Sequence, residues 1–166
     1  ERTGIGEAVT KRLVEFLPAD QLTTEQEQEL RDLVTAEQAE KLRAAALEMR
    51  ACDPAVGSGA FPVGLLQEMV RLIALLDLRV HGRERIQQRN YAFDLKKQII
   101  ESCLYGVDIQ EQAIQICELR LWLYLVIDYQ VDAGLSLHER IKSIEPLPNL
   151  TFRVRVGDSL LDQLFG

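Results

Sequence analysis

The run Ala51-Cys52-Asp53-Pro54, followed by Gly57-Ser58-Gly59, constrains the fold more than any other part of the sequence. A short apolar segment ends there at an acidic residue, and two closely spaced glycines permit a tight turn. A long apolar run at helical spacing follows over residues 63–76, and Pro62 is tolerated in its first turn. The pattern therefore predicts a strand that ends near Asp53, a glycine turn and a largely buried helix.

The same order of strand and helix recurs later in the chain. Residues 104–109 are a second short apolar run that contains Asp108, and residues 111–129 continue at helical spacing. Phe152, Val154 and Val156 alternate with polar residues, which predicts a third strand with one buried face, as suits a sheet edge. Strands that alternate with helices imply right-handed crossovers. We therefore predict an α/β fold with a parallel sheet of about three strands and flanking helices.

The first 48 residues show only helical patterns. Apolar residues at helical spacing predict one helix before Pro18 and one or two helices after it. Thr23 and Thr24 are N-cap candidates, and Glu27 stands three residues after Thr24, which predicts a capping box. Further along, residues 81–90 are polar and predict a break before another helix. We divide the chain into an N-terminal helical segment, residues 1–48, and a sheet-containing domain, residues 49–166.

Composition excludes several classes of function. With 19 basic and 26 acidic residues the net charge is −7, so the chain lacks the positive field that phosphate-backbone binding requires. No apolar run reaches the length of a membrane span, so we expect no membrane association. Cys52, Cys103 and Cys117 lie among apolar neighbours without metal-ligand spacing. This predicts buried thiols, no metal site and a reducing, cytoplasmic compartment.

Acidic residues stand at or just after the ends of the three predicted strands, at Asp53, Asp108 and Asp158. In open parallel sheets, ligands bind beyond the carboxyl ends of the strands, so these residues are candidates for one site. Asp108 has the position of the acid that binds ribose hydroxyls in nucleotide-binding folds, and Gly57 and Gly59 let the backbone approach a ligand. Asp53 directly precedes the turn, where it repels phosphate and attracts an amine or a sulfonium. This favours S-adenosylmethionine over a dinucleotide.

Three segments, in this order, resemble the motifs of adenine-N6 DNA methyltransferases, particularly the large fused restriction-modification enzymes and their phage-defence relatives. Residues 53–61 resemble the first, cofactor-binding motif. Residues 104–109 resemble the second, together with the helix residues Ala113, Leu119, Arg120, Leu121 and Trp122. Residues 148–150 and 155–160 resemble the third. The resemblance implies part of a Rossmann-like, S-adenosylmethionine-dependent methyltransferase fold from about residue 47 onward.

The resemblance also implies a role for individual residues. The methionine part of S-adenosylmethionine would be surrounded by residues of the turn, namely Asp53, Ala55, Gly57, Gly59 and Phe61. The ribose would bind Asp108, and the adenine ring would pack on Ile109. The adenine amino group would donate to Asp158, with Ser159 nearby.

The catalytic motif of the family is Asn or Asp followed by Pro-Pro and an aromatic residue, and it holds the flipped adenine. Prolines occur here at positions 18, 54, 62, 146 and 148 and are never adjacent. We therefore assign no catalytic residue and expect a methyltransferase domain truncated before that motif. By itself the chain is expected to bind cofactor without transferring methyl, and DNA would be contacted mainly through other parts of a parent protein of bacterial defence.

Alternative interpretations remain for the function and for single residues. A non-catalytic binding module on the same fold, or a methyltransferase acting on RNA, protein or a small molecule, fits the same pattern. Asp108 could cap the following helix, Asp158 could be a turn acid, and Phe61 could pack in a core. A solvated face is expected for the basic residues Arg79, Arg83, Arg85, Arg89, Lys96 and Lys97. An open edge at the first strand would favour self-association.

Overall fold

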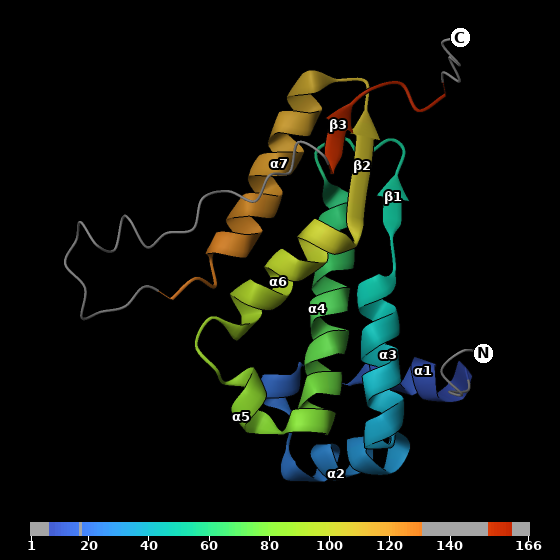
Figure 1. Ribbon diagram of the computed structural model, residues 1–166, viewed down its shortest axis with the longest axis vertical. Coiled ribbons are helices and arrows are strands. Elements are labelled where there is room, and N and C mark those ends of the chain that lie inside the picture. The colour runs from blue at the N-terminus through green and yellow to red at the C-terminus, as the bar shows by residue number, and fades with distance from the viewer. Residues whose placement is uncertain (1–6, 17, 131–152, 161–166) are drawn as a thin grey trace, which may run out of the picture.

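The computed structural model describes residues 7–16, 18–130 and 153–160. A small sheet lies at one end of an elongated arrangement of helices (Figure 1). Its strands β1 (Ala51–Asp53), β2 (Leu104–Asp108) and β3 (Val154–Val156) are parallel and lie in the order β1-β2-β3. The predicted α/β fold with three parallel strands and flanking helices is confirmed.

The register of the sheet brings the strand ends close to one another. Asp53 pairs with Gly106, and Asp108 pairs with Val156. Strands β1 and β3 form the two edges, and among the described residues no strand pairs with the outer side of β1. The predicted outer position of the third strand is therefore confirmed, whereas the open edge of the first strand stays a prediction.

The helices that connect the strands follow the predicted order. Helix α4 (Ala60–His81) follows the glycine turn and ends at Gly82, α5 (Arg83–Ile86) is a short turn, and α6 (Tyr91–Ser102) leads into β2. Helix α7 (Glu111–Val126) follows β2. The sequence pattern predicted that this helix ends at Tyr129, and it ends earlier, at Val126. No helix in the described parts of the chain, α4 included, combines the length and the apolar content of a membrane span.

One face of the sheet is buried and the other is largely uncovered. Leu104 and Val154 lie in a core with residues of α4, α6 and α7. On the opposite face Cys52 is exposed, so the prediction of a buried thiol is wrong there, because no described element covers that face. It is confirmed for Cys103 and Cys117. On the expected buried face of the third strand, Val154 is buried and Val156 is exposed, whereas Phe152 lies outside the described residues.

The N-terminal helices form a second core against the C-terminal half of α4. Helices α1 (Glu7–Glu15), α2 (Thr24–Leu33) and α3 (Ala36–Glu48), with a short 3-10 turn (Ala19–Gln21), surround buried side chains that include Leu13, Leu30 and Leu76. Two helices therefore fill the region after Pro18. The boundary between residues 48 and 49 stays a prediction.

The capping box that begins α2 differs from the predicted one by one residue. Thr23 is the N-cap and pairs reciprocally with Gln26, whereas Thr24 is the first helical residue. Glu27 is therefore not the capping partner, and it forms an ion pair with Arg83 instead. A second capping box, Thr35 with Gln38, begins α3.

A buried carboxylate joins three helices. Asp77 of α4 is fully buried and accepts hydrogen bonds from Arg43 Nε of α3 at 2.6 Å and from the Tyr91 hydroxyl of α6 at 2.7 Å. His81 Nε2 lies 3.9 Å from the same carboxylate. Burial and the hydrogen bond to Asp77 raise the pKa of Tyr91, so its hydroxyl stays protonated and remains a donor.

Several basic residues serve the fold instead of facing solvent. Arg79 Nε donates to the Val34 carbonyl oxygen at 2.6 Å, and Arg83 donates to the Leu22 carbonyl oxygen at 2.5 Å. Lys96 is buried and donates to the Tyr124 carbonyl oxygen at 2.9 Å. The predicted solvated face is therefore wrong for these residues, because their cationic groups connect neighbouring helices.

Candidate functional site

The segments that follow β1 and β2 are held together by backbone hydrogen bonds. Val56 N donates to the Val107 carbonyl oxygen at 2.9 Å, which extends the pairing of the two strands. Gly57 N donates to Asp108 Oδ2 at 2.8 Å. The glycine turn and the acidic end of β2 therefore form one connected surface.

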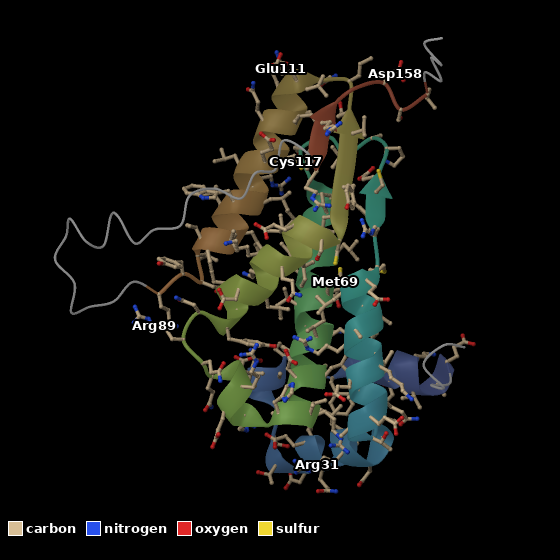
Figure 2. All side chains as sticks on the ribbon, in the orientation of Figure 1. Arg31, Met69, Arg89, Glu111, Cys117 and Asp158 are labelled. Carbon is tan, nitrogen blue, oxygen red and sulfur yellow. The ribbon has the colours of Figure 1, made fainter. Side chains whose placement is uncertain are left out.

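The loop after β3 joins this surface. Gly157 N donates to the Asp108 carbonyl oxygen at 2.9 Å, and Ser159 Oγ donates to the Pro54 carbonyl oxygen at 2.9 Å. Figure 2 shows Asp158 at the end of the molecule where β2 ends and Glu111 begins α7, far from Arg31 of α2. The expectation that three strand ends converge is thus met by the described residues. Residues 148–150, which belong to the same resemblance, lie outside the described residues.

The glycine turn depends on two left-handed backbone conformations. Gly57 has a φ of 52° and Gly59 a φ of 86°, a region that side-chain-bearing residues rarely adopt. At Gly59 space is also lacking, because an added Cβ would lie 2.6 Å from Cys117 Sγ of α7. At Gly57 an added Cβ would meet nothing within 4 Å. Asp53 Oδ1 accepts from Ala55 N at 3.0 Å and fixes the start of the turn.

Gly106 has a role that sequence reasoning did not assign. A Cβ at this position of β2 would lie 2.8 Å from Val56 Cγ2. The missing side chain therefore lets Val56, which is buried, pack directly on the strand. This contact seats the turn on the sheet.

Asp108 is the central group of the site. Its Oδ1 accepts from Gln110 N at 2.9 Å, and its Oδ2 accepts from Gly57 N. These bonds, that of Gln110 first, hold the pKa of Asp108 below its ordinary value. The stabilisation that these hydrogen bonds give is therefore present above the ordinary pKa of the carboxyl and is lost as pH falls through the lowered pKa.

Gln110 and not Asp108 is the N-cap of α7, so the capping alternative is wrong.

Two apolar side chains beside the turn and the β2 end are exposed. Phe61, the second residue of α4, is 57% exposed, and Ile109 is 70% exposed. The core-packing alternative for Phe61 is therefore wrong. Asp158 Oδ1 accepts from Leu160 N at 2.9 Å, so Asp158 does act as a turn acid, while its second oxygen makes no hydrogen bond with a described residue.

Arg120 contacts the glycine turn, a contact that sequence reasoning missed. Its Nη1 donates to the Ser58 carbonyl oxygen at 3.1 Å and lies 3.3 Å from Ser58 Oγ. A signal was present in the sequence, since Arg120 is the single basic residue between positions 111 and 126. Cys117, one turn earlier, packs under Gly59.

A parallel sheet with a glycine turn after its first strand, and acids at its strand ends, is consistent with part of a Rossmann-like methyltransferase fold. The chain belongs to the family of the MmeI DNA-methyltransferase domain, whose family model matches residues 24–161. The chain is therefore part of a DNA-methyltransferase domain of this family.

The chain is also similar to a protein of Methanocaldococcus jannaschii described as "Putative type II restriction enzyme and methyltransferase". The two are 37% identical over 114 residues, which cover 69% of this chain and 9% of the relative. The chain thus spans a small part of the relative's length. No solved structure matches the chain significantly.

Proposed function

We propose that the chain binds S-adenosylmethionine within an adenine-N6 DNA methyltransferase of a restriction-modification or defence system. The observation that carries the proposal is the Asp108 carboxylate, which backbone N–H groups of Gly57 and Gln110 fix between the glycine turn and the loop after β3. Each carboxylate oxygen has further acceptor capacity. A pair of adjacent ribose hydroxyls is a matching donor set.

The two sides of Asp108 suit the two ends of this cofactor. On one side lies the turn, where Asp53 supplies a negative charge for the ammonium and sulfonium groups, and Gly57, whose Cβ position is open, leaves room for the methionine chain. On the other side lies exposed Ile109, an apolar surface for the adenine ring. The unbonded oxygen of Asp158 would accept from the adenine amino group.

The residues of this chain would bind and orient the cofactor, and none of them is assigned a chemical step. When bound, S-adenosylmethionine supplies an electrophilic methyl group. Transfer would be direct and in line to the exocyclic amine of a flipped adenine. The group that holds this amine, and most of the DNA contacts, would belong to other parts of the parent protein, since the net charge here is −7.

Replacing Asp108 with alanine is expected to weaken S-adenosylmethionine binding roughly 10- to 100-fold, because hydrogen bonds to a charged acceptor are lost. Calorimetric titration with S-adenosylmethionine measures the effect, and Asp108→Asn, which keeps an acceptor oxygen, should lose less. Asp94→Ala on α6 is the matched control for removal of an exposed acid. Unchanged affinity in Asp108→Ala would remove this residue from the site, and a wild-type chain without affinity would overturn the proposed function.

We also expect these 166 residues to self-associate when purified alone. The outer side of β1 has no described partner strand, and an open edge favours pairing with another chain. An apolar stripe on α7 and its C-cap residue, which we call the outer stripe, is about half exposed or more and consists of Ile116, Leu119, Leu123 and Ile127. Exposed apolar patches of this kind favour association.

Sedimentation velocity over a range of concentrations tests this expectation. The double substitution Leu119→Glu with Leu123→Glu should shift the chain toward monomer, whereas Gln115→Glu adds charge to α7 outside the outer stripe and should not. A wild-type chain that stays monomeric at all concentrations would show that the open edge and the outer stripe do not drive association.

A further inference from the structure

A positive charge, the guanidinium of Arg120, lies at the glycine turn. Arg120 donates from Nη1 to Ser58, and no carboxylate within the described residues lies at ion-pair distance from it. Arginine carries five N–H donors, and these contacts use one of its nitrogens. Arg120 is the single basic residue of α7, so its guanidinium is the positive group that this helix presents to the turn.

Arg120 and Asp53 both act electrostatically on the Cys117 thiol. The Cys117 thiol beneath Gly59 has its pKa raised to about 11, first by burial and then by Glu118. The positive charge of Arg120 lowers this pKa, whereas the negative charge of Asp53 raises it, as burial does. Both charges therefore act at the place where the turn passes over α7.

A zwitterionic ligand fits this arrangement of charges. The amino-acid end of the cofactor carries an ammonium and a carboxylate, and Asp53 can attract only the first of them. With Asp108 also negative, a carboxylate entering this region would be repelled unless a cation lay nearby. Arg120 is a cation that contacts the turn, since its guanidinium donates to the Ser58 carbonyl oxygen.

We propose that Arg120 is a positioning residue for the amino-acid end of S-adenosylmethionine. It holds the Ser58 peptide, and hence the orientation of the turn between Gly57 and Gly59, and its guanidinium balances the carboxylate of the ligand. This inference rests on the proposed function. The ribose and adenine ends, which are assigned to Asp108 and Ile109, are independent of Arg120.

Two ligands that differ only at the amino-acid end separate this role from general support of the fold. S-adenosylhomocysteine contains the amino-acid end, whereas 5′-methylthioadenosine has the same adenine, ribose and sulfur without it. In Arg120→Met, affinity for S-adenosylhomocysteine should fall about tenfold or more, as for a lost charge-assisted interaction. Affinity for 5′-methylthioadenosine should change less than about twofold, within the effect of a distant surface substitution.

Arg120→Lys serves as a second variant, since it keeps the charge and loses the planar donor geometry, and it should show a smaller loss with the same ligand preference. If Arg120→Met fails to fold, the Lys variant carries the comparison. Arg31→Met, at the opposite end of the molecule (Figure 2), is the matched control and should leave both affinities unchanged.

Equal loss for both ligands would overturn the inference, because Arg120 would then support the turn without reading the amino-acid end. No loss for either ligand would overturn it as well. Asp108→Ala should weaken both ligands alike, since both contain the ribose, so this pattern supports the proposed function whatever Arg120 does. A wild-type chain that binds neither ligand overturns the proposed function and the inference together.

Discussion

Replacing Asp77 with alanine is expected to lower the free energy of unfolding by about 3 kcal/mol. The substitution leaves the Arg43 guanidinium and the Tyr91 hydroxyl without the acceptor that joins α3, α4 and α6. The loss should lie toward the lower end of the range for broken buried pairs, because the Arg43 side chain is 26% exposed and regains some hydration. Urea denaturation followed by circular dichroism measures the effect.

Two further variants test the reason for this loss. Asp32→Ala removes an exposed acid of α2 and should change stability by less than about 0.5 kcal/mol. A triple variant, Arg43→Met with Asp77→Leu and Tyr91→Phe, replaces the whole network with apolar groups and should recover most of the lost stability. A loss below about 1 kcal/mol in Asp77→Ala would mean that the carboxylate contributes no more than an ordinary hydrogen bond.

Gly59→Ala is the second substitution with a large expected effect, about 2–4 kcal/mol of lost stability. It combines a left-handed φ of 86° with a Cβ that would lie 2.6 Å from Cys117 Sγ. Gly57→Ala is the matched comparison, because its φ is 52° and its Cβ would meet no atom within 4 Å. That variant should lose only the conformational part, about 1–2 kcal/mol.

Thermal or urea unfolding of the two glycine variants provides the comparison. Combining Gly59→Ala with Cys117→Ala should recover only part of the loss, since the Cα and Cβ of residue 117 remain 3.2 Å from the new methyl group. Similar losses in Gly57→Ala and Gly59→Ala would show that the contact with Cys117 is unimportant.

The strands and long helices could be predicted because their boundaries are local. β1 and β2 are short apolar runs that each end at an acidic residue. Helix α4 is a long apolar run that ends at a glycine. The capping error at α2 arose because two threonines stand side by side, and only backbone conformation decides that Thr23 is extended and Thr24 helical. Apolar neighbours in the sequence likewise do not show which face of a strand is covered, and this caused the error at Cys52.

The site was predictable in residue types but not in contacts. The glycines and acids could be assigned to strand ends, whereas Asp108 meets Gly57 through a backbone N–H 51 residues away, which no side-chain pattern encodes. Arg120 and Ser58 are 62 residues apart, and only the presence of a single basic residue in α7 indicated a contact. Lys96 shows the reverse case, because its place in a basic run concealed a buried hydrogen bond.

The packing of Cys117 beneath Gly59 gives the turn an intrinsic chemical probe. The thiol is fully buried and its pKa is raised to about 11, so an alkylating reagent reaches a reactive thiolate only when the turn moves away from α7. Cys52 is exposed on the uncovered face of the sheet and reacts without such an opening. The ratio of the Cys117 alkylation rate to the Cys52 alkylation rate therefore reports the opening equilibrium of the glycine turn in the native chain. A ligand that closes the turn will slow the alkylation of Cys117 and leave the rate at Cys52 unchanged as the reference.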